Sequence, residues 1–393
     1  MTHHLAHLPA TDTIPAVALS YAEVHVDNHQ RRLRGRVALR PDIDLDAFTT
    51  RAVIDWLDIR VKTIHATQPG WVFRRIKEAT GEGCYAKQLD HGHTFRIRFQ
   101  EPGLDVVRTA IEAIGNHMGI DGDVLIDGIE VSLDFTPRLP GDDNLRRTLL
   151  AVLAHHFMPN RDVVRVRLRD RPRFVWGEGK EATGFFFPRS ESGLHEKWLF
   201  MLNDGDRPAC AGSTVYYGRQ DAPSTWRIMD KVLDRQNRTA GTFKQLRDRE
   251  KRVRIEVTLQ GTALEEIGLL TFTDVETFNF AKLTRYFRFL LPTFLDVNGL
   301  CPSAGNSVIR HLRQERITKF LNTGMVGLAA METDWSKWRA ERRAELRDKP
   351  APNGKRLQPP RSGNGPMQTF LAYEELNKRV EMAMRKLTER ERR

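Results

Sequence analysis

Three segments of this chain alternate polar and apolar residues so regularly that a β-strand is the structure that best separates the two kinds of side chain. They are "HTFRIRF" (93–99), "GIEVSLDF" (128–135) and "KRVRIEVTL" (251–259). Successive side chains of a strand point to opposite faces, so each segment presents one apolar face and one polar face. We therefore expect these strands in a sheet that buries one face in a core.

Helical patterns and further strands separate these three segments. A strand is predicted over 53–63, and helices over 71–80, 104–119 and 144–157, the first closed by Gly81. "STVYYG" and "TWRIMDK" read as the two arms of a hairpin. This mixture predicts an α+β fold with a largely antiparallel central sheet from two similar halves, packed helices and a helical C-terminal region.

Composition changes along the chain suggest five segments. We expect a loose leader at 1–20, a continuous α+β domain at 21–262, and a helical region at 263–347 for DNA or a partner. "VETFNFAKLTRYFRFLLPTFL" (275–295) is predicted to be helical within that region. A Pro- and Gly-rich linker covers 348–366, and a C-terminal helix covers 367–393, either a solvated tail, which we favour, or a partner helix.

The charge of the chain favours a polyanionic partner. Its formal net charge is +11 over 393 residues, which suits DNA, RNA or an anionic surface. No apolar run reaches the roughly 18 residues that a membrane-spanning helix needs, so no membrane partner is expected. Cys84, Cys210 and Cys301 lie far apart and the N-terminus lacks a secretion signal, so we expect a cytoplasmic protein.

Acidic residues lie on the polar faces of two predicted strands. Glu130, Ser132 and Asp134 share one face of "IEVSLDF", and Glu256 lies on the polar face of the last strand with Arg254. A solvated polar face is the plainer interpretation. Three acids from two strands can instead bind Mg²⁺ or Mn²⁺, since these ions prefer carboxylate and water oxygens.

The hairpin places cations beside two tyrosines. Arg227 and Lys231 share a strand face with Met229, and such cations can hold a phosphate. Tyr216 and Tyr217 point to opposite faces. A basic surface hairpin, with the tyrosines as packing residues, is the alternative interpretation.

The order of these segments resembles the replication initiation factor family, the Rep_trans-type initiators of rolling-circle plasmids and some filamentous phages. The series runs "FRIRFQEP", a helix, "GIEVSLDF", "STVYYGRQDAPSTWRIMDK" and "RVRIEVTL". In that family R-I-x-F-x-P precedes a helix, followed by L-D-L-x-x-D-F, T-x-Y-F-G-x-R, R-I-Y-x-K and R-x-E-x-x-L. The resemblance covers roughly Trp56 to Thr262.

The resemblance implies an endonuclease and ligase that binds an origin, single-stranded or cruciform at the nick site, and nicks one strand. A tyrosine attacks the phosphodiester, leaving a 5′-phosphotyrosyl enzyme and a free 3′-OH, with help from a divalent metal. A host helicase is the implied partner, and a second copy of the chain, in a homodimer, is a further expectation. Glu130, Asp134 and Glu256 stand at the acidic positions of the family. The expected phosphate contacts are Arg227, Lys231, Arg219 and Arg254.

One position departs from the family pattern. Met229 stands where R-I-Y-x-K carries the nucleophilic tyrosine, and a thioether cannot attack phosphate. Among the six tyrosines, Tyr217 lies opposite Met229 if the turn is centred near Ala222 or Pro223, so we expect Tyr217 as the nucleophile and Tyr216 as second choice. A DNA-binding regulator without catalysis is the main alternative, and an RNA-binding protein with an RRM-like sheet is a third.

Overall fold

The computed structural model describes most of the chain and divides it into two compact units. Unit 1 consists of Met1–Leu45, Asp142–Tyr217 and Phe287–Glu374, and unit 2 of Asp46–Gly141, Gly218–Tyr286 and Glu375–Arg393. Each unit therefore draws on three separate segments, whereas the sequence predicted consecutive domains. The described residues are 2–5, 17–26, 33–81, 83–159, 173–176, 183–186, 214–219, 221–237, 242–301, 303–347 and 370–392.

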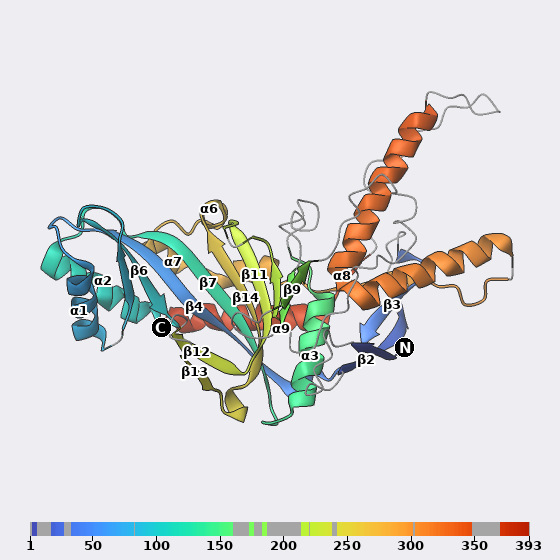
Figure 1. Cartoon of the computed structure of the whole chain (residues 1–393), viewed down its shortest axis with the longest axis horizontal. Helices are drawn as coiled ribbons and strands as arrows, with labels where there is room; N and C mark the ends of the chain where they lie inside the picture. Colours follow the sequence, from blue (N-terminus) through green and yellow to red (C-terminus); the bar gives the residue numbers. More distant parts are fainter. Residues whose placement is uncertain are drawn as a thin grey trace. The chain divides into compact units, whose positions relative to one another are not determined.

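Unit 2 is built on an antiparallel sheet, which confirms the predicted α+β class. Its strands follow the order β5-β6-β4-β7-β14-β11, and Figure 1 shows them side by side. The strands are β4 (Phe48–Lys62), β5 (Tyr85–Gln88), β6 (Thr94–Gln100), β7 (Leu125–Pro137), β11 (Ser224–Lys231) and β14 (Arg252–Gln260). A separate hairpin joins β12 (Leu233–Asn237) to β13 (Thr242–Gln245).

Alternation gives this sheet an apolar face, as the three segments predicted. On β7, Ile129, Val131 and Leu133 are fully buried, and β14 buries Val253, Ile255, Val257 and Leu259 in the same way. Helices supply the rest of the unit 2 core. They are α1 (Pro69–Thr80), α2 (Leu104–Met118), α6 (Thr262–Ile267), α7 (Phe272–Thr277) and α9 (Glu374–Glu391).

The C-terminal helix α9 is part of the unit 2 core and not a solvated tail. It buries an apolar stripe that includes Leu376, Val380 and Leu387, and Figure 1 shows it running behind the strands. The Thr388 hydroxyl accepts a hydrogen bond from the Phe280 amide (2.9 Å), and Arg390 donates one to the carbonyl of Ala52 (3.1 Å). The stripe was visible in the sequence, but its partner surface was not.

Unit 1 contains a second sheet, in the order β1-β2-β3-β16, and the strand order β10-β8-β9. Its strands are β1 (Thr2–Leu5), β2 (Val17–His25), β3 (Arg36–Pro41), β8 (Arg173–Trp176), β9 (Thr183–Phe186), β10 (Thr214–Tyr217), β15 (Leu290–Leu291), β16 (Thr293–Leu295) and β17 (Leu371–Ala372). Its helices are α3 (Asp143–His156) and α8 (Ala304–Arg347).

Helices α3 and α8 meet at a glycine where α8 is broken. Gly324 has a φ of 65°, in the left-handed region, and a Cβ there would lie 2.8 Å from the carbonyl oxygen of His155. Only glycine fits that conformation and approach. His155 bonds the Leu321 carbonyl through Nε2 (3.0 Å), and burial lowers the pKa of His156 to about 3. His156 is therefore neutral, and both histidines are core residues.

Two expectations about local structure are wrong. Thr2–Leu5 is not part of a loose leader, because β1 pairs antiparallel with β2. The segment 275–295 is not one helix, because it divides into the end of α7, a 3-10 helix at Phe280–Tyr286, β15 and β16. There β15 pairs with β17 and β16 with β3, so tertiary pairing overrides helix propensity.

Several predicted segments fall outside the part of the chain that the structure describes. The segments "DVVRVRLRD" (162–170) and "KWLFMLN" (197–203), which the sequence also predicts to be strands, and the linker at 348–366 lie outside the described residues. The similarity of two halves of the sheet stays a prediction. Within the described ranges, no helix has both the length and the apolar character to cross a membrane.

The burial of α9 can be tested with two residues of the same helix. Leu387 is fully buried, whereas Met382 is 55% exposed. We expect Leu387→Ala to lower the free energy of unfolding by about 2–5 kcal/mol, because it leaves a cavity, and Met382→Ala to change it by less than about 0.5 kcal/mol. Chemical denaturation measures both. Equal effects of the two substitutions would contradict the packing of α9.

Candidate metal centre

The pairing register of the strands brings several acidic residues together on the polar face of the unit 2 sheet. Across the β7 and β14 pair, Ser132 lies opposite Glu256, and Glu130 lies opposite Thr258. On the other side of β14, Arg227 of β11 lies opposite Glu256. Directly paired residues share a face, so the acids of β7 and β14 meet between these strands, as the sequence predicted for Glu130 and Glu256.

A β-bulge brings in a third acid that the sequence reasoning missed. Ile54 of β4 pairs with Val131 and Trp56 pairs with Glu130, so Asp55 is the extra residue between them. A bulge sets two residues of one strand against one of its partner, and here Asp55 and Trp56 lie opposite Glu130. The signal is in the sequence: the buried positions of β4 change phase from Ala52 and Ile54 to Leu57.

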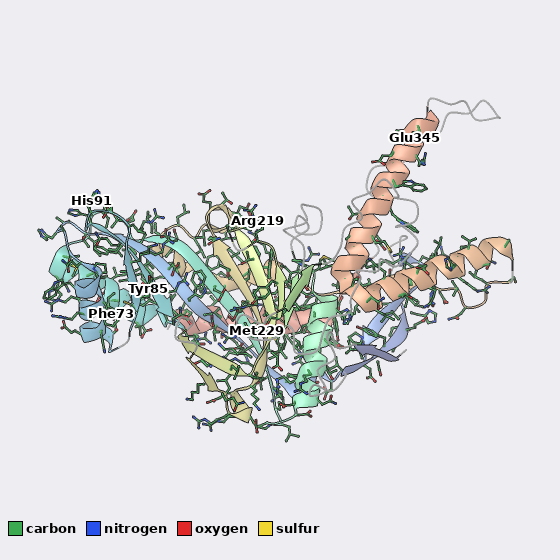
Figure 2. All side chains as sticks on the ribbon, in the orientation of Figure 1. Phe73, Tyr85, His91, Arg219, Met229 and Glu345 are labelled. Carbon is green, nitrogen blue, oxygen red and sulfur yellow. The ribbon has the colours of Figure 1, made fainter. Side chains whose placement is uncertain are left out.

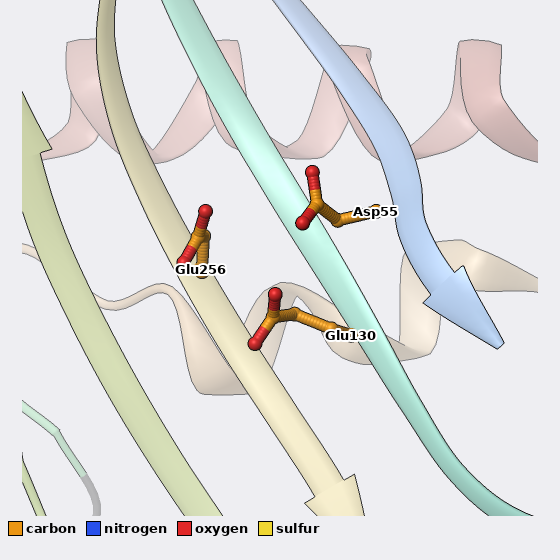
Figure 3. A group of neighbouring side chains, drawn as sticks. All are labelled: Asp55, Glu130 and Glu256. Carbon is orange, nitrogen blue, oxygen red and sulfur yellow. The ribbon is translucent and has the colours of Figure 1, made fainter. Parts of the chain in front are cut away.

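Asp55, Glu130 and Glu256 form a compact triad of carboxylates, which we call the acidic triad. Each offers an oxygen, and these oxygens all lie within 4.8 Å of one another. Figure 3 shows the three side chains converging from neighbouring strands on one side of the sheet. Glu130 is 8% exposed and Glu256 2% exposed. Three carboxylates this close and this buried repel one another unless positive charge lies among them.

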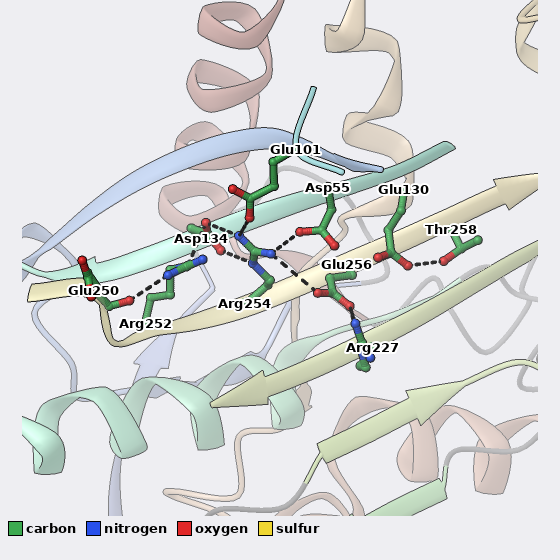
Figure 4. A network of polar contacts seen from close by, with 10 residues as sticks. All are labelled: Asp55, Glu101, Glu130, Asp134, Arg227, Glu250, Arg252, Arg254, Glu256 and Thr258. Atoms are coloured by element: carbon green, nitrogen blue, oxygen red, sulfur yellow. Dashed lines mark hydrogen bonds and ion pairs between the residues drawn. The ribbon is translucent and has the colours of Figure 1, made fainter. Parts of the chain in front are cut away.

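Each carboxylate of the acidic triad is held through one oxygen. Thr258 donates its hydroxyl to Glu130 Oε2 (2.5 Å), Arg227 donates to Glu256 Oε2, and Arg254 donates to Asp55 Oδ1. Figure 4 shows these contacts. Such contacts fix the orientation of the carboxylates. Oε1 of Glu256 also lies 3.9 Å from Arg254 Nη1, and each of the three residues can offer one carboxylate oxygen to a metal ion. The triad is thus arranged so that it can hold a metal ion.

Asp134 is not part of this arrangement, contrary to the sequence prediction. It receives two hydrogen bonds from Arg254, from Nε (2.6 Å) and Nη2 (2.7 Å), and Arg252 Nε lies 3.0 Å from its Oδ2. Both oxygens are therefore occupied by guanidinium groups. Alternation correctly placed Asp134 on the polar face, but its pairing with Arg254 across the strands makes it a structural ion-pair partner.

Ser132 is the second indication that a ligand belongs at this site. Its side chain is fully buried between Glu130 and Asp134 on the same strand face, directly opposite Glu256. Its hydroxyl oxygen has no hydrogen-bond partner among the described residues. A buried hydroxyl without a partner costs roughly 1–3 kcal/mol. A bound cation with its water ligands would supply that partner, and the carboxylate donor set suits Mg²⁺ or Mn²⁺.

Protonation provides part of the missing positive charge when no cation is bound. Burial raises the pKa of Glu256 to about 8, opposed by Arg227 and reinforced by Glu130 and Asp55. Burial also raises the pKa of Glu130, against the hydrogen bond from Thr258. Burial of the Arg254 guanidinium lowers its pKa, but the hydrogen bonds to Asp134 and the negative charges of Asp134, Asp55 and Glu256 together raise the pKa by more.

The four predicted phosphate contacts have different surroundings. Arg254 is 1% exposed and committed to carboxylates, so it is not a phosphate contact. Arg219 pairs with Asp221 in the turn between the hairpin strands. Arg227 is 28% exposed in its side chain and touches the acidic triad through Glu256. Lys231 is half-buried on β11, opposite Arg252. Arg227 is therefore the predicted contact that the structure places at the site.

The two tyrosines differ in exposure. Tyr217 is 1% exposed and packs on Phe157, with ring centroids 5.2 Å apart, and burial raises the pKa of its phenol. A buried phenol with a raised pKa is a poor nucleophile. The surroundings of Tyr217 therefore differ from those expected of the nucleophile that the sequence predicted. Tyr216, its neighbour on β10, is half-buried. Met229 lies opposite Arg254 on the polar face of unit 2.

Comparison with known proteins does not assign a family. No protein-family model matches this chain, and no curated protein matches it. A class II 3-hydroxy-3-methylglutaryl-CoA reductase from Streptococcus pneumoniae, solved with NADPH, is 12% identical over 97% of this chain and 90% of that one, with a TM-score of 0.20. A second structure of that enzyme is 11% identical over 84% and 85%, with a TM-score of 0.16. Scores this low do not indicate a shared fold.

The raised pKa of Glu256 predicts a pH-dependent stability. Because the folded pKa lies above the value of the unfolded chain, the stability contributed by neutral Glu256 is present below pH 4.5 and lost as the pH rises through about 8. In EDTA we expect Glu256→Gln to become more stable than the wild type between pH 5 and 9, by on the order of 1 kcal/mol or more. Denaturation at several pH values, with the exposed Glu265→Gln as control, measures it. If the free energies of unfolding of Glu256→Gln and wild type changed with pH in parallel, the raised pKa of Glu256 would be contradicted.

The composition of the acidic triad predicts which aspartate matters for metal binding. We expect Asp55→Asn to weaken Mn²⁺ binding by about tenfold or more, because affinity follows the charge of the ligands. Asp134→Asn, the matched control on the same face, should weaken it much less. Isothermal titration calorimetry measures both. A larger loss for Asp134→Asn would restore the ligand set predicted from the sequence.

Proposed function

We propose that this protein is a DNA-nicking replication initiator of the rolling-circle type, with a divalent cation held by Asp55, Glu130 and Glu256. The observation that carries the proposal is the acidic triad beside the unpartnered hydroxyl of Ser132. The cation is proposed to be Mg²⁺ or Mn²⁺, and when bound it would polarise a nonbridging phosphate oxygen and offset charge in the transition state. The net charge of +11 supports a polyanionic substrate.

The protein residues around the acidic triad have separate tasks in this proposal. Thr258 and Arg254 orient Glu130 and Asp55 through the hydrogen bonds described above. Arg227 is partly exposed at the same site and can contact a phosphate oxygen while it remains near Glu256. A buried, preorganised set of charges is worth more than the same set in water.

The nucleophile in this proposal is a tyrosine oxygen that forms a bond to phosphorus while the bond from phosphorus to the 3′ oxygen breaks. The phenol loses its proton, the 3′ oxygen gains one, and the protein keeps a 5′-phosphotyrosyl bond. Of the two hairpin tyrosines, Tyr216 is only half-buried and Tyr217 is fully buried. We therefore rank Tyr216 above Tyr217, the reverse of the order that the sequence suggested.

A DNA-binding regulator without catalysis is the second candidate. Met229 favours it, because the strand position that carries the nucleophile in the resembling family holds a thioether here, and this residue lies opposite Arg254 at the polar face. The acidic triad weighs against it, because carboxylates near phosphate weaken binding unless a cation lies between them. Nicking therefore separates the two candidates.

Two phenylalanine variants test the nicking proposal. The substrate is a supercoiled plasmid that carries the coding sequence of this chain with its flanking DNA, incubated with Mn²⁺. We expect wild type and Tyr217→Phe to nick it and form a covalent adduct, and Tyr216→Phe to lose both by at least about a hundredfold, because a ring without the hydroxyl cannot attack. Mass spectrometry of the adduct locates the linked residue.

Three outcomes of this experiment are informative. An adduct on Tyr216 supports the proposal as stated, and an adduct on Tyr217 supports nicking but restores the sequence-based ranking. Binding of the plasmid without any nick, in Mn²⁺ and in Mg²⁺, supports the regulator instead.

A further inference from the structure

The polar face of unit 2 continues past the acidic triad onto the strands β4, β6 and β5. In one row across the strands, Tyr85 of β5 pairs with Arg98 of β6, and Arg98 pairs with Asp58 of β4. In the next row, Lys87 pairs with Arg96, and Arg96 pairs with Arg60. Paired residues share a face, so these side chains lie on the face that carries Glu130.

Tyr85 is an exposed aromatic residue at the edge of this face. It is 66% exposed on the edge strand β5, and Figure 2 labels it at that end of the sheet, away from Met229. Strand geometry puts it roughly 15 Å from Glu130 of the acidic triad, across the three strand spacings from β5 to β7. An exposed ring can stack on a planar ligand without displacing any protein contact.

Arg98 presents a second planar group next to Tyr85. Its guanidinium donates from Nε and Nη2 to the two oxygens of Asp58, both at 2.6 Å, and lies 4.1 Å from the centroid of the Trp56 ring. The ring itself lies against Gly128, where a Cβ would come within 3.0 Å of it. The Arg98 side chain is nevertheless 39% exposed, so a rigid guanidinium plane faces outward beside Tyr85.

Cations outnumber carboxylates on this part of the face. Arg60 and Arg96 share the single carboxylate of Asp127, and Lys87 is exposed on β5. With Arg98 and Asp58 the set holds four cations and two carboxylates. The arginine side chains of this pair are 43% and 45% exposed, so their charge is accessible to a ligand.

We infer that this face, defined by Tyr85, Lys87, Arg96, Arg98 and Arg60, binds single-stranded DNA and leads it to the acidic triad. Proteins that bind single strands combine a cationic track for the backbone with aromatic rings and arginine planes for the bases. Here one exposed ring, that of Tyr85, and four cations lie in two neighbouring rows of one sheet face. The inference rests on the proposed function for the choice of DNA over RNA.

The geometry favours a single strand over a duplex. Base stacking on Tyr85 requires an unpaired base, because the faces of paired bases are covered by their neighbours. The face also lacks the helix that most duplex readers insert into the major groove, since its groups all project from strands. A duplex would therefore use only the cations, and Tyr85 would contribute little to its affinity.

The test measures binding in EDTA by the anisotropy of a fluorescein-labelled oligothymidylate, so that metal-dependent nicking cannot interfere. We expect Tyr85→Ala to weaken binding about tenfold through the loss of one stacked base, and Tyr85→Phe, which keeps the ring, to bind within twofold of wild type. Trp71→Ala on α1, another exposed aromatic residue, is the control and should bind like wild type. A duplex of the same length should not distinguish Tyr85→Ala from wild type.

The salt dependence checks the cationic part of the face. Lys87→Ala should reduce the slope of the logarithm of affinity against the logarithm of salt concentration by about 0.7, the value for one phosphate contact on a single strand. The substitution leaves the ion pairs of the arginines intact. An unchanged slope would remove Lys87 from the track.

Three results would overturn the inference. They are an unchanged affinity in Tyr85→Ala, equal losses in Tyr85→Phe and Tyr85→Ala, or tighter binding of oligouridylate than of oligothymidylate, which would assign the face to RNA. The double variant Glu130→Gln and Glu256→Gln separates this inference from the proposed function. It should bind oligothymidylate at least as tightly as wild type in EDTA, with the same dependence on Tyr85, and lose metal-dependent nicking. Tyr85-dependent binding in a wild type that does not nick would reject the proposed function and keep the track.

Discussion

The buried guanidinium of Arg254 is the interaction on which the polar face of unit 2 depends. It bonds both oxygens of Asp134 on β7 and reaches Asp55 on β4, with Glu256 on its own strand 3.9 Å away. A buried cation is costly unless its donors are paired, and buried carboxylates are costly for the same reason. Here each cost offsets the other, and the three strands are tied together on their polar face. The acidic triad can therefore lie close together without the sheet separating.

The same sheet serves two purposes through its two faces. The apolar face packs against helices, α9 among them, and its alternation sets the register of every strand pair. Register then determines which polar residues meet on the other face, because a shift by one residue would exchange the faces. The single irregularity that matters for chemistry is the bulge at Asp55, which adds a carboxylate without disturbing the buried residues on either side. The position of the acidic triad is thus a consequence of how the core packs.

The sequence predicted the elements of this sheet well, because alternation and helical spacing are local signals. Glu130 and Glu256 were correctly placed on one face, since strand periodicity alone decides that. Asp134 was assigned to the metal because alternation cannot say which acid a neighbouring arginine occupies, and that depends on the cross-strand register with Arg254. Asp55 was missed because a bulge breaks the periodicity on which the reasoning relied. The burial of Tyr217 depends on Phe157, a residue distant in sequence, and the interleaving of segments in the two units left no local trace.

In unit 2, the C-terminal helix α9 is bonded to residues near the start of β4, which are far away along the chain. Arg379 of α9 bonds Asp46, and Arg390 bonds Ala52, across separations of 333 and 338 residues. Contacts of such high sequence separation form late, because the entropy of closing a long loop must be lost before they contribute. Until α9 docks, the apolar surface that it covers is open to water and to other chains. The folding of this sheet is accordingly expected to wait for its last helix, and aggregation competes during that interval.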